Sequence, residues 1–337
     1  MKTKKPSVVV IGGGTGTYTI LSALKDKNVK VTALMTMVDD GGSNKVLRDE
    51  FGLLPTSGIR LAMVALSAEQ SLMRDLFVYR FHQGNGISGM TFGNLFLAAM
   101  ADITGSQEKA IEATAKFLNV RGEILPISYD NVQLVAQYED GTRVIGEHYI
   151  DEPEHDGKLR ITNMWTEPKA TINPQARTAI QSADLIILGP GDFYTNTIAN
   201  LVIHGVPEAI MQSQGKLVFV TNLMTKYGDA YQYRASDYIR DLSKYIPASR
   251  LNVVIINNDE AFPVAAIQKY REEHSEPVKN DLSSKTINPS VQIMQKPLLS
   301  ATIIDMQKGD RVKRSMIRHD SEKLAQAIME ILAAKHE

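Results

Sequence analysis

The residues best suited to chemistry near the start of the chain form a glycine-rich turn. It consists of Gly12, Gly13, Gly14, Thr15 and Gly16. The turn follows the β-branched run Val8–Ile11, which is typical of a buried parallel strand, and precedes a segment with helical spacing. Glycines let the backbone approach an anion closely, and the start of the next helix offers unpaired amides. The third glycine of the dinucleotide fingerprint is replaced by Thr17, and no Walker lysine follows. The turn predicts a phosphate cradle, with a tight structural turn as the alternative.

A pair of aspartates follows the next apolar run, Val31–Val38. Asp39 and Asp40 precede two glycines and Ser43, where the acid that binds ribose stands in a nucleotide-binding β-α-β unit. One carboxylate could accept from a ribose hydroxyl, and the pair could hold Mg²⁺ through water beside a diphosphate. We therefore predict Asp39, Asp40 and Ser43 as ligand positions and the two aspartates as metal positions. Plain turn chemistry with solvated acids is the alternative.

A second glycine-containing turn follows a later strand, Asp184–Leu188. Its candidate ligand positions are Gly189, Gly191, Asp192 and Thr195. The two glycines free the backbone, and Thr195 or Asn196 could cap a helix that follows. Two anion-receptive helix starts on one sheet edge would suit a diphosphate, so the two turns together are more specific than either alone.

Five further positions are weaker candidates for ligand contact. Gly93 and Asn94 open a predicted helix, where the amide could meet a base or sugar, although capping or packing explains it equally well. Asn222 follows the strand Lys216–Thr221 and so lies at its carboxyl end. Tyr270 is a candidate for a contact from a lid over the ligand. Arg318 is a candidate for a contact with a phosphate or a sugar.

The order of apolar runs predicts an α/β fold with a doubly wound, mostly parallel sheet. Residues 1–122 and 171–337 form the expected Rossmann-like core. Residues 123–170 are expected to form a small antiparallel β insertion, because Glu139-Asp140-Gly141 separates two strand-like runs in the manner of a hairpin.

The composition argues against several classes of protein. The net charge is −1, with 37 basic and 38 acidic residues, so we expect neither nucleic acid nor anionic membrane as a partner. The absence of cysteine excludes disulfides and thiolate chemistry. No apolar run approaches the ~18 residues of a membrane span, and we expect a cytoplasmic protein. The histidines have no metal-ligand spacing, and no nucleophile stands beside a convincing base.

These motifs, in this order, resemble the CofD-like superfamily and most closely its gluconeogenesis-factor (YvcK-type) branch. The similarity extends from about Val8 to Met224, with a weaker block at Ile317–Asp320. Besides the turns above, the blocks that carry it are Leu47–Gly52, Val64–Ser67, Leu76–Phe81 and Gly93–Leu95. The resemblance implies a Rossmann-like core that binds a nucleotide-type ligand across the strand ends.

The resemblance leaves three functions open. The branch implies a regulatory protein that binds UDP-sugars, notably UDP-N-acetylglucosamine, and links carbon metabolism to cell-wall precursor supply and cell shape. The superfamily's enzyme, 2-phospho-L-lactate transferase, implies an Mg²⁺-dependent transfer onto a deazaflavin precursor. An oxidoreductase using NAD(P) is the third, since NAD could occupy the same cleft. We favour the regulator, without turnover of its own, as a homo-oligomer that has an enzyme of amino-sugar synthesis as a partner.

The chain departs from the pattern of the resembled family at four places. They are Asn44–Val46, Thr56–Gly58, Met90 and Tyr227–Ala230. At these places, in the same order, the family commonly has Ser-Gly-Arg, Pro-Gly-Asp, His and Pro-Gly-Glu-Thr. These replacements remove polar or cationic groups from the expected cleft, which weighs against the transferase.

Overall fold

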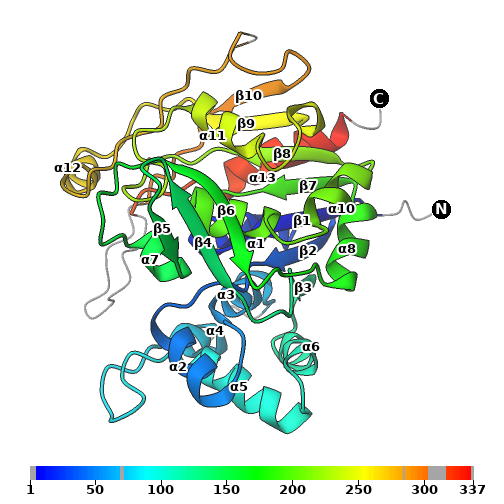
Figure 1. The fold of residues 1–337 in the computed structure, drawn as a ribbon. Helices are drawn as coiled ribbons and strands as arrows, with labels where there is room; N and C mark the ends of the chain where they lie inside the picture. The colour runs from blue at the N-terminus through cyan, green and yellow to red at the C-terminus, as the bar shows by residue number, and fades with distance from the viewer. Residues whose placement is uncertain (1–4, 69–71, 284, 303–315, 335–337) are drawn as a thin grey trace.

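The computed structural model describes residues 5–68, 72–283, 285–302 and 316–334. Seven parallel strands of this part of the chain form one sheet in the order β10-β9-β8-β7-β1-β2-β3, and three strands form a small antiparallel sheet in the order β5-β4-β6 (Figure 1). The predicted α/β fold with a parallel sheet and an antiparallel insertion is confirmed.

The elements have the following bounds. The strands are β1 (Ser7–Gly12), β2 (Lys30–Met35), β3 (Glu123–Pro126), β4 (Gln133–Tyr138), β5 (Arg143–Ile145), β6 (Ile161–Glu167), β7 (Leu185–Leu188), β8 (Lys216–Val220), β9 (Val253–Asn257) and β10 (Gln292–Lys296). The helices are α1 (Gly14–Leu24), α2 (Gly42–Phe51), α3 (Ser57–Leu66), α4 (Leu72–Val78), α5 (Phe92–Thr104), α6 (Gln107–Phe117), α7 (Glu147–Asp151), α8 (Pro174–Gln181), α9 (Ala199–Leu201), α10 (Val206–Gln212), α11 (Ala235–Leu242), α12 (Val264–Glu272) and α13 (Ser321–Ala333), with a π-helix η1 (Phe193–Ile198) and a 3-10 turn η2 (Ala248–Arg250).

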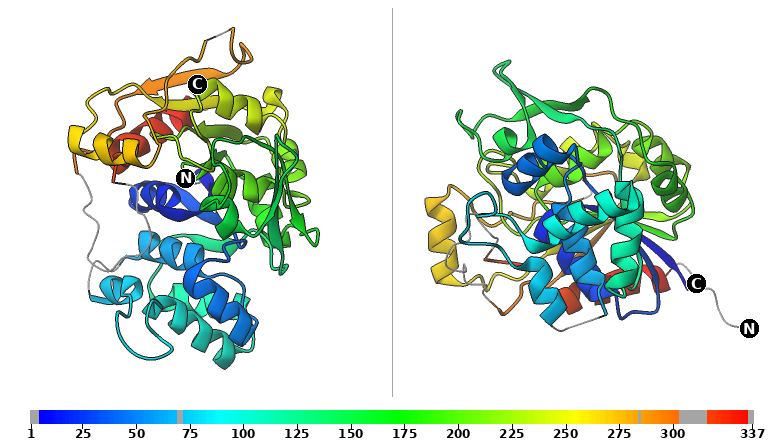
Figure 2. Two further views of the ribbon diagram at one scale, coloured as in Figure 1. Left: turned by 60° about the vertical axis from the view of Figure 1, so that its left-hand side comes forward. Right: turned by 90° about the horizontal axis from the view of Figure 1, so that it is seen from below.

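Alternation along the strands builds a core on each face of the main sheet. In β1, Val8 and Val10 pack in the core shared with α1, α3 and α13, whereas Val9 and Ile11 pack in the core shared with α8, η1, α10 and α11. Figure 2 shows α1 and α13 on one side of the sheet and the green helices, with the small sheet, on the other. Both faces are covered, so the strand residues that pack in the two cores are apolar, as a buried parallel sheet requires.

The order in which strands are added to the main sheet reverses between β1 and β7. From β1 the strands β2 and β3 extend to one side, and β7 to β10 extend to the other. Ligands of open α/β sheets bind where such a reversal separates two neighbouring loops at the carboxyl ends of the strands. Here those loops are the two glycine-rich turns predicted from the sequence.

Two features of the fold differ from the sequence-based expectation. Glu123–Pro126, placed in the insertion from the sequence, pairs with β2 as a parallel strand of the main sheet, so the antiparallel insertion begins later. Strand β10 was not anticipated because its sequence, QIMQK, is half polar, as suits the edge of a sheet.

Candidate functional site at the carboxyl edge of the sheet

The two glycine-rich turns lie in direct backbone contact. A Cβ atom on Gly16 would lie 2.2 Å from the carbonyl oxygen of Pro190, and one on Gly191 would lie 3.2 Å from the carbonyl oxygen of Gly13. A Cβ atom on Gly13 would meet the side chain of Asn196 at 2.1 Å. Most of the glycines are therefore required for packing, and a ligand must bind above the turns rather than between them.

The start of α1 is open to an anion. The helix begins at Gly14, its N-cap residue Gly13 has no side chain to accept from the first amides, and no acidic residue stands in the first turn. Gly14 has a φ of +63° and only ordinary contacts around it, and Gly14, Thr15 and Gly16 are partly exposed. The first amides of an α-helix have no partner within the helix, so those of α1 can receive a phosphate.

The second turn is closed by an internal carboxylate. The backbone amides of Phe193 and Tyr194, at the start of η1, donate to the Asp229 carboxylate at 2.7 and 2.8 Å. We predicted an open helix start capped by Thr195 or Asn196, and this prediction is wrong. Asp192 is the N-cap position, and the Thr195 hydroxyl donates to Asp151 on α7 at 3.2 Å.

Asp229 is one of several acids on this edge that have partners inside the protein. Burial raises its pKa to about 7, with the nearby Asp192 adding to the shift. Lys226 forms ion pairs with Asp151 and, at 3.0 Å, with Asp192. Burial opposes the charge of Lys226, but these two carboxylates outweigh burial and raise the pKa of the ammonium well above its usual value. One lysine thus joins the insertion to the start of η1.

The predicted pair of aspartates is engaged in the local structure. The two Asp39 oxygens accept from the Gly41 amide at 3.0 Å and the Asn44 side chain at 2.7 Å, and Asp40 accepts from the His148 amide at 2.8 Å. Burial raises the pKa of Asp39, although its two donors oppose the shift.

The predicted metal positions do not fit a preformed metal site. Both oxygens of Asp39 already have donors, and one oxygen of Asp40 is bound to the backbone of α7. Within the described residues, no group of three or more His, Cys, Asp or Glu side chains is arranged to hold a metal ion. The side chain of Ser43, the third predicted position of this turn, lies outside what the structure describes.

Two predicted positions lie in the interior rather than on the edge. Asn94 is 1% exposed, accepts from Arg60 at 3.0 Å and donates to Ser57 at 3.2 Å. A Cβ atom on Gly93 would lie 2.6 Å from the Arg60 side chain. Packing, the alternative that the sequence left open, explains Gly93 and Asn94.

The remaining predicted positions surround the carboxyl end of β8. Asn222 donates to the carbonyl oxygen of Gly191 at 2.8 Å and so holds the second turn in place. The buried Tyr270 hydroxyl accepts from the Ile317 amide at 3.3 Å, beside the half-buried Arg318. Burial lowers the pKa of the neighbouring His319 to about 4. Tyr270 therefore positions the segment that carries Arg318 and His319.

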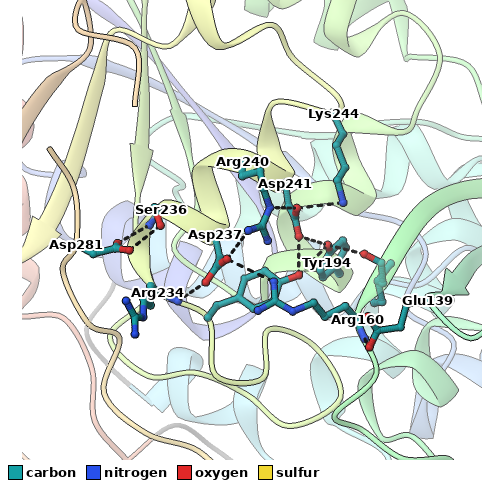
Figure 3. A network of polar contacts seen from close by, with 12 residues as sticks. Glu139, Arg160, Tyr194, Arg234, Ser236, Asp237, Arg240, Asp241, Lys244 and Asp281 are labelled. Carbon is teal, nitrogen blue, oxygen red and sulfur yellow. Dashed lines mark hydrogen bonds and ion pairs between the residues drawn. The ribbon is translucent and has the colours of Figure 1, made fainter. Parts of the chain in front are cut away.

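A second polar network supports the start of η1 from behind (Figure 3). The Tyr194 hydroxyl donates to Asp241 on α11 at 2.8 Å, and Asp241 also binds Arg240 at 3.2 Å and Lys244 at 3.0 Å. Arg160, which precedes β6, pairs with Asp237 on the same helix at 3.4 Å. The insertion and α11 therefore meet through the ion pair of Arg160 with Asp237.

Comparison with known proteins shows which family the chain is similar to. The sequence matches the family described as "2-phospho-L-lactate transferase CofD" over residues 8–299. The chain belongs to the CofD family.

It is 34% identical over 329 residues to the "Gluconeogenesis factor" of Bacillus subtilis, covering 98% of this chain and 99% of that one. It is 37% identical over 332 residues to the protein of the same name from Halalkalibacterium halodurans, covering 97% of each. The crystal structure of a UPF0052 family member from Bacillus halodurans superimposes with a TM-score of 0.87 at 34% identity, covering 97% of this chain and 99% of that one. The resemblance inferred from the motifs is confirmed.

The places where this CofD-family chain departs from the pattern retain polar contacts. Asn44 links Asp39 to the start of α3, because its side-chain oxygen accepts from Thr56 and Ser57. Asp229, in the fourth departing segment, binds η1.

None of the helices in the described part of the chain has the length and apolar composition of a membrane-spanning segment.

Several acids and the lysine that organise this edge were not predicted from the sequence. Lys226 and Asp229 follow a predicted strand, as Asn222 does, so their position was a usable signal. Asp151 and Asp241 carried no such signal, because only folding brings the insertion and α11 to the edge.

The contact between the turns predicts unequal effects of two glycine substitutions. In Gly16→Ala the new methyl group would overlap the Pro190 carbonyl, so we expect a loss on the order of 2 kcal/mol in the free energy of unfolding. The control is Gly58→Ala on α3, where the new atom makes only ordinary contacts, with Met35 at 3.4 Å and the Thr36 carbonyl oxygen at 3.6 Å, and alanine favours the helix. Urea unfolding of both variants tests this; equal stability would show that the turns are not packed as described.

The buried imidazole predicts a specific effect of acid. His319 is neutral when folded, whereas in the unfolded chain it binds a proton near its usual pKa of 6.5. The unfolded state binds more protons between these values, so stability falls as the pH falls from about 6.5 to about 4. Lowering the pH from about 7 to about 5 should therefore reduce the free energy of unfolding by on the order of 2 kcal/mol through this one group. His319→Gln should therefore lose less stability than the wild type in urea unfolding over that range. Identical losses would contradict the assignment.

Proposed function

We propose that this protein is a nucleotide-sugar-binding regulator that takes UDP-N-acetylglucosamine or UDP-glucose at the carboxyl edge of the sheet. The observation that carries the proposal is the uncapped start of α1 at the reversal point between β1 and β7. A diphosphate is the part of a UDP-sugar that such amides would hold. Asn222 and Arg318, at the end of β8, are the polar side chains proposed for the rest of the ligand.

The electrostatics of the edge support one phosphate subsite rather than two. Asp229 occupies the amides of η1, and Lys226 compensates Asp151 and Asp192. The start of α1 has no side-chain cap and stays available to an outside anion. We therefore assign the phosphates to Gly14–Gly16, and the second turn to their support.

The biological role follows from the family at a coarser level. Relatives similar over nearly their whole length are named gluconeogenesis factors, and we propose that ligand binding in the cytoplasm reports on the supply of cell-wall precursors and so affects cell shape. A homo-oligomer and contact with an enzyme of amino-sugar synthesis are part of the same proposal.

A transferase of the CofD type is the second candidate, favoured by the family match over residues 8–299. In that reaction Mg²⁺ would stabilise charge on the phosphates of the donor. The carboxylates of this edge lack the arrangement of a preformed metal site, which favours binding over turnover. Release of a nucleoside monophosphate in the presence of Mg²⁺ and a deazaflavin acceptor would establish the enzyme instead.

The binding site is tested by placing a fixed negative charge where the phosphate is proposed. Thr15→Glu puts a carboxylate in the first turn of α1, which stabilises a helix by roughly 0.3–1 kcal/mol and excludes a second anion. We expect unchanged or higher thermal stability and UDP-N-acetylglucosamine binding at least about tenfold weaker by isothermal titration. Ala265→Glu, in the exposed first turn of α12, is the matched control and should bind like the wild type.

The same titration series separates the candidate functions. The wild type should release heat with UDP-N-acetylglucosamine or UDP-glucose, and EDTA should leave that binding in place. Absence of heat with both UDP-sugars, alongside heat with NAD or GDP, would refute the proposal.

A further inference from the structure

A large cavity lies on the same edge of the sheet but away from the glycine-rich turns. Its volume is about 780 Å³, within the usual range of small-molecule sites. It is formed by the ends of β9 and β10, the segment after α12 and the loop that follows β8. None of its lining residues belongs to the turns after β1, β2 or β7. The nucleotide edge proposed above does not account for it.

Five carboxamide side chains belong to the polar lining, beside five charged ones. Gln232, Asn258, Asn280 and Gln295 line the cavity and are exposed to solvent. Each carboxamide offers a donor and an acceptor side by side, which matches hydroxyl groups that both donate and accept. Tyr231 adds an aromatic ring with a polar end.

A fifth carboxamide fixes one wall of the cavity. The side-chain oxygen of Asn257 accepts from the amides of Leu298 at 2.8 Å and Asp259 at 3.2 Å, and its nitrogen donates to the Asp259 carbonyl at 2.8 Å. The loop that presents Asn258 is thereby held in one conformation, and a preformed wall lowers the entropic cost of binding.

The charges of the lining argue against an anionic ligand. Arg271 and Lys279 line the cavity together with Asp259, Glu260 and Glu276. Because the carboxylates outnumber these two cations, the cavity has no excess of positive charge to hold a phosphate. In this it differs from the start of α1, where open amides favour an anion.

We propose that this cavity is a second ligand site, for a neutral polyhydroxylated ligand of the saccharide class. The carboxamides would bind the hydroxyls, and the faces of Tyr231 and Phe262 would cover the apolar C–H face of a sugar ring. The volume suits a ligand of one or two sugar rings.

The cavity and the nucleotide edge share one segment of chain, Thr225–Gln232. At one end Thr225 is bound to Glu276 of the cavity wall, through its amide at 2.8 Å and through its hydroxyl at 3.0 Å. In the middle, Lys226 and Asp229 hold η1. At the other end, Tyr231 and Gln232 line the cavity. A ligand in the cavity therefore contacts the segment that positions η1, which makes it an effector of the nucleotide edge; this coupling alone rests on the proposed function.

The test uses free sugars, so that it does not depend on nucleotide binding. N-acetylglucosamine and glucose are added to the full-length protein, and binding is followed by ligand-observed NMR. The variant Asn258→Ala/Gln295→Ala should bind the sugar roughly tenfold more weakly, because each truncation removes a donor and an acceptor. Gln268→Ala, an exposed carboxamide of α12 outside the cavity lining, is the matched control and should bind like the wild type. The thermal unfolding of all three proteins should agree.

Three results would overturn the proposal. They are no contact of either sugar with the wild type, sugar binding that the double variant leaves unchanged, and sugar binding that Thr15→Glu abolishes, which would place the sugar on the nucleotide edge. Titration with UDP separates this inference from the proposed function. UDP should bind the double variant as it binds the wild type, and if UDP fails to bind either protein the sugar result still stands.

Discussion

The close contact between two backbone turns at the centre of the sheet is the constraint on which the carboxyl edge depends. Strands β1 and β7 are neighbours, so the turns that follow them must occupy adjoining space. Gly16 lies so close to the Pro190 carbonyl that any side chain there would overlap it. This contact fixes where α1 and η1 begin, and with them the positions of the two helix starts.

Charge distribution then gives the two helix starts different roles. Asp229 accepts from two amides of η1, whereas α1 has no side-chain cap among the residues that the structure describes. Lys226 offsets the acids that the insertion and η1 bring together. An edge with several carboxylates can thus still present one anion-receptive position, because the charges around it are compensated from within.

The main sheet was predictable where strands are buried on both faces. Val8–Ile11 and the runs that became β2, β7, β8 and β9 are mostly apolar, and covering of both sheet faces demands that pattern. Strand β10 lacked it because one of its edges faces solvent. The assignment of Glu123–Pro126 failed for a different reason: the sequence shows a strand there but not which partner it pairs with.

The family, the parallel sheet and the turn that begins α1 could be predicted, since these depend on residue type and on spacing along the chain. Which of the candidate residues share a surface could be seen only in the tertiary structure. In the folded protein, Asn94 lies in the interior, and an amide of η1 donates to Asp229 rather than to an outside anion. A cavity lies between β9, β10 and the segment after α12. Such outcomes depend on contacts between residues far apart in the sequence, and local propensity contains no information about them.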